Sequence, residues 1–177
     1  MSSEVNMLKE INGWWVPEYD TLFTKKLLRK NSEKQLENPH YVAYEHKYRK
    51  YLLNMMSHKR TMLDVGSNIG TWSRCMCNHF DEVIAFEPSL LNIKAFKKNL
   101  SKYKNVKLIE KGLSDSVKSK VKFYLNPHNC GHIGIKKYKV DTQHKDDFYA
   151  DITTIDKCNF KNVDLIKVDV EGEEFSV

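Results

Sequence analysis

The stretch that decides the fold is Asp64-Val65-Gly66-Ser67-Asn68-Ile69-Gly70. Its first two residues end the short apolar run Thr61 to Val65, and its last two begin Ile69 to Phe80, which is typical of a helix. In open α/β sheets, ligands bind beyond the carboxyl ends of the strands. Gly66 permits a tight turn and a close ligand approach there, and Asn68 tolerates left-handed backbone better than most residues. The segment therefore predicts a strand, a ligand-binding loop and a helix that offers free N–H groups.

A second strand supplies an acid at a matching distance. Glu82 to Phe86 is mostly apolar and is followed by Glu87-Pro88. Glu87 lies 23 positions after Asp64. An acid about 20 residues after a glycine loop is where ribose hydroxyls are bound in nucleotide-binding sheets. The pair of segments therefore predicts a nucleoside site.

The remaining chain alternates strands and helices. This pattern predicts an α/β, Rossmann-like, doubly wound and mostly parallel sheet, with strand order 3-2-1-4 and N-terminal helices before it. We expect residues 1–58 to form a helical extension and residues 59–177 the main domain. The expected elements are irregular residues 1–17, helices at 18–29, 32–56 and 89–103, strands at 106–110, 121–125 and 163–170, and a turn-rich loop at 126–134.

The bulk composition narrows the class of protein. The chain has 177 residues, 41% hydrophobic and 29% charged, which is typical of a soluble globular domain. No apolar run approaches the roughly 18 residues of a membrane span. The N-terminus predicts no signal peptide, and the four cysteines predict free thiols in the cytoplasm. The net charge of +6 permits an anionic partner, but a solvated lysine surface is the favoured interpretation, and we expect no nucleic-acid partner.

Three segments together resemble one family. Asp64-x-Gly66-x-Asn68-x-Gly70, then Ala85-Phe86-Glu87-Pro88, then the run from Asp164 to Glu174, DLIKVDVEGEE, are similar to the FkbM family of methyltransferases. The resemblance covers about Tyr48 to Val177. It implies a Rossmann-like fold, S-adenosyl-L-methionine (SAM) as methyl donor, and O-methylation of a hydroxyl on a sugar, polysaccharide or secondary metabolite.

The resemblance also implies a cofactor site. The glycine loop holds the methionine part of SAM, Glu87 holds the ribose, and the adenine lies near Leu113 to Asp115. The cofactor-binding residues expected on this basis are Asp64, Gly66, Ser67, Asn68, Gly70, Glu87, Pro88, Leu113, Ser114 and Asp169.

The end of the last strand carries the candidates for catalysis, Asp169 and Glu171. Both point to one face of an extended chain, close to the expected sulfonium and acceptor. For Asp169 three roles stay open: general base, electrostatic partner of the sulfonium, or metal ligand. For Glu171, helix capping is the alternative to a role in catalysis. Lys167, inside the same strand, is a weaker functional candidate, and a surface position is its alternative. His128-x-Cys130-x-His132 lacks a fourth ligand, so no metal site is predicted, although this loop is expected to border the acceptor pocket.

Members of the family continue beyond the position of Val177, so we expect a C-terminally truncated domain with its fourth strand at an edge. A second copy, a partner chain, or strands of this chain between Phe123 and Thr153 are the candidates to cover that edge. A non-catalytic SAM-binding remnant within an assembly is the alternative function. An NAD-dependent oxidoreductase is disfavoured because Gly-x-Gly-x-x-Gly is absent.

Overall fold

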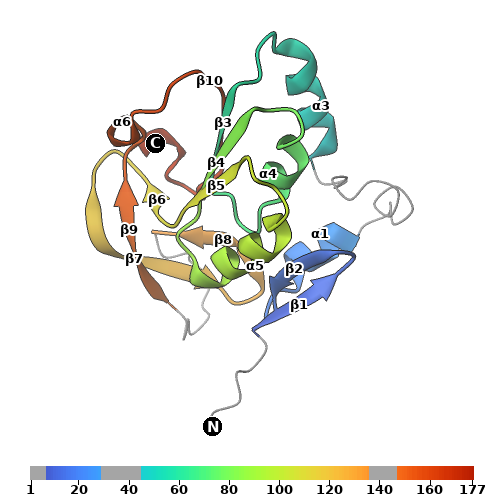
Figure 1. The fold of residues 1–177 in the computed structure, drawn as a ribbon. Helices are drawn as coiled ribbons and strands as arrows, with labels where there is room; N and C mark the ends of the chain where they lie inside the picture. Colours follow the sequence, from blue (N-terminus) through green and yellow to red (C-terminus); the bar gives the residue numbers. More distant parts are fainter. Residues whose placement is uncertain (1–6, 29–44, 136–146) are drawn as a thin grey trace.

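The computed structural model describes residues 7–28, 45–135 and 147–177, and a parallel sheet lies at its centre (Figure 1). The sheet has the order β10-β3-β4-β5. Its central strand β3 (Thr61–Val65) pairs with β10 (Val163–Val168) on one side and with β4 (Glu82–Phe86) on the other, and β5 (Val106–Ile109) pairs with β4. All five residues of β3 are buried. The predicted α/β class with a parallel sheet is confirmed.

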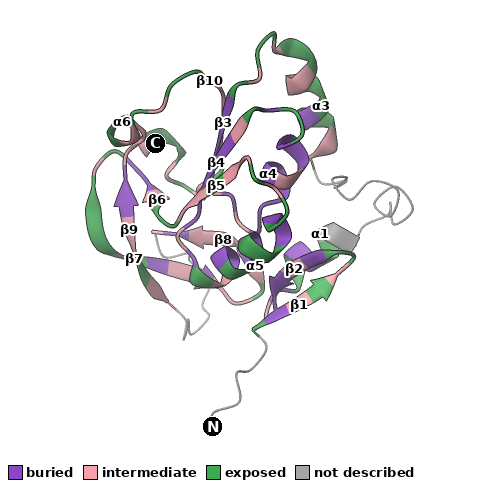
Figure 2. Cartoon of the chain, viewed as in Figure 1, coloured by how far each residue is buried: buried purple, intermediate pink, exposed green. Residues whose placement is uncertain are grey.

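One face of the sheet is covered by helices. Met62 and Val83 pack against α4 (Thr71–Met76) and against apolar residues of α3 (His46–Met55). Ala85 packs against α5 (Leu90–Leu100). Figure 2 shows that buried residues concentrate in β3, β4 and α4. The helix expected at 69–80 is shorter because Gly70, at φ 90°, stands at its N-cap and Cys77 at its C-cap. Of the helix expected at 32–56, residues 32–44 lie outside the described part.

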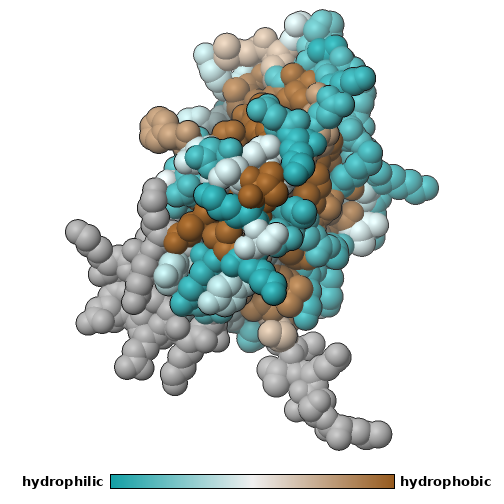
Figure 3. Space-filling model, turned by 90° about the vertical axis from the view of Figure 1, so that its left-hand side faces the viewer, coloured by the Kyte–Doolittle hydropathy of each residue, from teal (hydrophilic) through white to brown (hydrophobic). Residues whose placement is uncertain are grey.

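The opposite face carries a second hydrophobic cluster. Leu63, Val65, Ile84 and Phe86 share it with residues of α6 (Ile155–Cys158) and with the segment after β10, which ends in the 3-10 helix η1 (Glu174–Ser176). Figure 3 shows apolar surface gathered in patches on the side of the molecule where α6, β9 and β7 lie.

A second sheet of order β6-β9-β7-β8 bears on two predictions. It contains β6 (Gly112–Leu113), β7 (Lys118–Asn126), β8 (Asn129–Gly134) and β9 (Phe148–Thr153). The expected loop at 126–134 is therefore mostly a strand, β8, which pairs with β7 antiparallel. Strands between Phe123 and Thr153 were one candidate to cover the edge of the fourth strand, but in the described residues none of them pairs with β10.

The N-terminal residues 7–17 form a hairpin, where an irregular segment was predicted. β1 (Leu8–Ile11) and β2 (Trp14–Pro17) are joined by Asn12-Gly13, whose φ angles are 50° and 74°. Positive φ at both central residues is the turn that Asn-Gly favours, so the sequence held a signal that was not used. α1 (Leu22–Leu28) follows.

Asn99 of α5 hydrogen-bonds both to this hairpin and to the glycine loop. Its amide donates to the carbonyl oxygens of Trp15 (3.0 Å) and Ile69 (2.9 Å) and accepts from the Trp15 N–H (2.7 Å). The hairpin, α5 and the start of the glycine loop are thereby joined. In the described part of the chain no helix is long and apolar enough to cross a membrane.

Candidate functional site

A pocket opens at the carboxyl ends of the parallel strands and encloses about 1010 Å³, its open mouth included. Its walls come from both sheets and from both sides of β3. They include the loop Gly66, Ser67 and Asn68, the pair Glu87 and Pro88, Asn92 of α5, Lys111 to Leu113, Asn129 to Gly131 of β8, and Lys167, Asp169, Val170, Glu171 and Glu173.

The glycine loop is shaped by three residues with positive φ. They are Gly66 (74°), Asn68 (52°) and Gly70 (90°). A Cβ on Gly66 would lie 1.9 Å from the carbonyl oxygen of Asp169, so only glycine lets the loop approach the segment after β10. A Cβ on Gly70 would lie 2.2 Å from Leu100 Cδ1. Gly70 thus serves packing against α5, and it is not among the residues that line the pocket.

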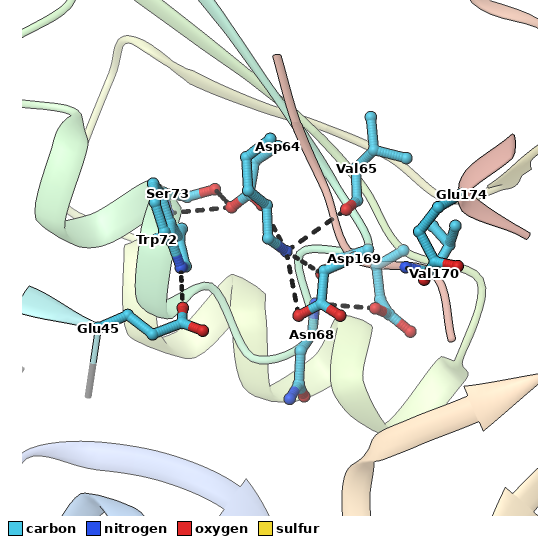
Figure 4. A network of polar contacts seen from close by, with 12 residues as sticks. Glu45, Asp64, Val65, Asn68, Trp72, Ser73, Asp169, Val170 and Glu174 are labelled. Carbon is cyan, nitrogen blue, oxygen red and sulfur yellow. Dashed lines mark hydrogen bonds and ion pairs between the residues drawn. The ribbon is translucent and has the colours of Figure 1, made fainter. Parts of the chain in front are cut away.

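Asp64 lies behind the loop and not on the pocket wall. It is fully buried, and its Oδ2 accepts from the N–H (3.0 Å) and the hydroxyl (2.7 Å) of Ser73 at the start of α4 (Figure 4). Its Oδ1 accepts no well-formed hydrogen bond from the described residues, and the Lys167 ammonium lies 3.2 Å from it. Asp64 was expected to bind the cofactor, whereas these contacts support a role in ordering the loop and the start of α4.

Lys167 is turned inward from β10, where the sequence left a surface position open. Its side chain is 12% exposed. Its ammonium donates to the carbonyl oxygens of Gly66 (2.7 Å) and Val65 (3.3 Å). One cation therefore ties β10, β3 and the glycine loop together directly beneath the pocket.

Glu87 is buried on the pocket wall and is held by three donors. Oε2 accepts from the Asn68 N–H (2.8 Å), and Oε1 accepts from the Ser89 N–H (2.9 Å) and the Asn92 amide (3.3 Å). Burial raises the pKa of the Glu87 carboxyl to about 7, although these hydrogen bonds lower it. A carboxylate has about four acceptor positions, so Glu87 keeps capacity for a ligand hydroxyl. Ser89 stands at the N-cap of α5, but its side chain makes no capping bond.

Of the three residues expected near an adenine, only Leu113 lines the pocket. Leu113 lines the pocket and is buried. Ser114 is also buried, but its N–H donates to the Thr153 carbonyl oxygen, and it lies off the pocket wall. Asp115 is exposed and accepts a hydrogen bond from the Ser116 hydroxyl.

Acidic side chains form the wall after β10. The Asp169 N–H donates to the Val65 carbonyl oxygen, and its side chain is 53% exposed at the pocket, with Oδ2 at 3.9 Å from the Lys167 ammonium. Glu171 also lines the pocket and faces His132. Glu174 accepts from the N–H groups of Val170 and Gly172 and fixes the turn (Figure 4). Asp169 and Glu171 are thus brought to one cavity with the glycine loop and Glu87.

Other pocket residues were not identified from the sequence. The Asn92 amide bonds both Glu87 and the Cys130 carbonyl oxygen (2.9 Å), so it joins α5 to β8. Glu45, before α3, accepts from the indole N–H of Trp72 (Figure 4). The one usable signal was Asn92, a polar residue on the buried face of an amphipathic helix. Glu45 and β8 reach the pocket through tertiary packing that no local pattern encodes.

The described residues contain no group of three His, Cys, Asp or Glu side chains placed to hold a metal ion. In the histidine and cysteine segment that was weighed as a metal site, His128 is exposed and Cys130 is fully buried. The β8 strand that carries Cys130 borders the pocket, and the prediction that this segment faces the acceptor stays a prediction.

Comparison with known proteins identifies the family. The Methyltransferase FkbM domain matches residues 64–177, well over half of the sequence, so the chain belongs to the FkbM methyltransferase family. No curated protein sequence matches it. The crystal structure of an rRNA methylase from Streptococcus thermophilus aligns with a TM-score of 0.35 and 19% identity over 38% of this chain and 42% of that one. The match thus spans less than half of that methylase, and a likeness at this level carries no argument about function.

The first prediction concerns the Asp64–Lys167 pair. Lys167→Met leaves a buried carboxylate without its cation, so the free energy of unfolding should fall by about 3–5 kcal/mol. The double variant Asp64→Asn/Lys167→Met removes both charges and should recover part of that loss. The free energies are measured by urea denaturation.

Lys161→Met, at an exposed lysine just before β10, is the control and should change stability by less than about 0.5 kcal/mol. If Lys167→Met and Lys161→Met lowered the free energy of unfolding equally, the assignment of Lys167 to the core of the site would be contradicted.

Proposed function

We propose that this chain binds SAM and transfers the methyl group to a hydroxyl oxygen of a sugar, polysaccharide or secondary-metabolite acceptor. The observation that carries the proposal is the joining of Glu87 and the glycine loop on one pocket wall by the bond from the Asn68 N–H to Oε2. Family membership supports methyl transfer, and the pocket supports a nucleoside-containing donor.

The polar groups of the pocket fit such a donor. The Ser67 hydroxyl and the Asn92 carbonyl oxygen are buried, line the cavity and have no hydrogen-bond partner among the described residues. A buried polar atom without a hydrogen-bond partner costs free energy, so a polar ligand that pairs with these two atoms would be stabilised in the pocket. Glu87 would accept from the ribose hydroxyls, Leu113 would contact the adenine, and the loop from Gly66 to Asn68 would receive the methionine end.

The acidic wall fits a cationic donor and a hydroxyl acceptor. When bound, SAM supplies an electrophilic methyl group on a sulfonium for direct displacement. Asp169 and Glu171, both on the pocket wall, would attract that positive charge and take the proton of the acceptor hydroxyl. Positive charge develops on the acceptor oxygen as it bonds to the methyl carbon. A fixed carboxylate in a partly dry site stabilises that charge and lowers the barrier.

The second prediction tests donor binding. Glu87→Ala removes the expected ribose acceptor and should weaken S-adenosylhomocysteine binding by about 10–100-fold in calorimetry. Glu82→Ala, at the start of the same strand and paired with Lys107, should bind as the unchanged protein does.

NAD should not bind. Binding of NAD in place of S-adenosylhomocysteine, or equal affinities of the two variants for S-adenosylhomocysteine, would contradict the donor assignment.

The third prediction tests turnover. Labelled SAM is incubated with a panel of oligosaccharides and hydroxylated metabolites, and methyl incorporation is counted. Asp169→Asn should lower the rate by about 10²–10⁴-fold, as loss of a general base or electrostatic partner does, with S-adenosylhomocysteine affinity nearly unchanged. Tight binding without turnover on any acceptor would favour the alternative function, a SAM-binding component of an assembly.

A further inference from the structure

Glu171 sits on backbone that its neighbours hold in place. Its φ is 53°, a left-handed conformation that side chains rarely adopt. The N–H groups of the residues on both sides, Val170 and Gly172, donate to the Glu174 carboxylate at 3.0–3.2 Å. A strained residue that its surroundings hold this firmly is a common mark of a functional position. The turn therefore presents the Glu171 side chain to the pocket in a set direction.

A residue of the second sheet holds the carboxylate itself. His132 of β8 places Nε2 at 3.2 Å from Glu171 Oε2, and both side chains are about one-third exposed. Glu171 lines the pocket and His132 does not. Glu171 therefore offers a direct route by which His132 can affect a ligand in the pocket.

The hydrogen bonds behind His132 decide which ring nitrogen carries the proton. Asn126 Oδ1 accepts from the His128 N–H (2.9 Å), so its Nδ2 is the atom that faces His132 Nδ1, at 3.3 Å. An amide NH₂ only donates, so Nδ1 accepts and the ring proton lies on Nε2. Nε2 thus donates to the Glu171 carboxylate.

We propose that His132 is a positioning residue for the proposed methyl transfer: it holds the Glu171 carboxylate at the pocket mouth, where that carboxylate receives the proton of the acceptor hydroxyl. In the step, the acceptor oxygen bonds to the methyl carbon. The carbon–sulfur bond breaks with its electron pair on sulfur, and the acceptor proton passes to Glu171. The inference rests on the proposed function, because it assigns Glu171 a place beside the transferred methyl group.

A pair of ligands tests this without a known acceptor. Sinefungin carries an amino group where SAM carries its methyl group, whereas S-adenosylhomocysteine has nothing there. A carboxylate held at the transfer position favours sinefungin. Asp169 lies on the same wall in every variant, so the change in the ratio of the two dissociation constants between variants reports where Glu171 lies. A loss of fold or of general pocket shape weakens both ligands alike and leaves the ratio unchanged.

Calorimetry should show that the unchanged protein prefers sinefungin. Glu171→Gln and His132→Ala should each lower this preference by about 3–10-fold, the effect of one charge-assisted hydrogen bond, and the double variant should lower it no further. His132→Gln keeps a donor for Glu171 and should restore most of the preference. His128→Ala is the matched control from the same hairpin, with an exposed side chain, and should leave the ratio unchanged.

The outcomes separate the two claims. If neither ligand binds the unchanged protein, the proposed function fails and this inference falls with it. If both bind and His132→Ala leaves the ratio unchanged, the function stands and the positioning role is overturned. Long-range nitrogen–proton NMR of the free protein gives an independent check: a proton on Nε2 of His132 supports the hydrogen-bond chain, and a proton on Nδ1 overturns it.

Discussion

The buried contact between the Asp64 carboxylate and the Lys167 ammonium is the interaction on which the rest of the site depends. Asp64 orders the start of α4 through Ser73, and Lys167 holds the carbonyl oxygens of Val65 and Gly66. One pair of charges therefore fixes two strands, a helix start and the loop between them. Because Asp64 is fully buried, no water can replace Lys167 beside its carboxylate, and separating the pair is costly.

The second constraint is the close approach of Gly66 to the segment after β10. The distance of 1.9 Å from its absent Cβ to the Asp169 carbonyl oxygen leaves room for no side chain. This contact brings the acidic wall to the glycine loop, while Asn92 brings β8 to Glu87. The pocket thus forms where the two sheets meet: the glycine loop, Glu87 and the acidic wall follow strands of the parallel sheet, and β6 and β8 of the second sheet complete the lining.

The local parts of this site could be predicted from the sequence and the long-range parts could not. The apolar strands and the glycine loop follow from patterns only a few residues long, and the β4 strand was predicted with the bounds it has. The inward turn of Lys167 depends on its partner Asp64, more than 100 positions earlier, and strand alternation alone does not say which face a lysine takes. β8 was missed because Gly131 and His132 interrupt its apolar pattern, and its pairing with β7 outweighs that weak local preference.

We expect the cavity above β3 and β4 to be a nucleoside-binding SAM site. A crystal structure with bound S-adenosylhomocysteine tests it most directly. The ribose hydroxyls should lie within hydrogen-bonding distance of the Glu87 carboxylate, with the amino-acid end of the ligand against Gly66 to Asn68. A ligand bound elsewhere, or one whose ribose leaves Glu87 without a contact, would contradict it.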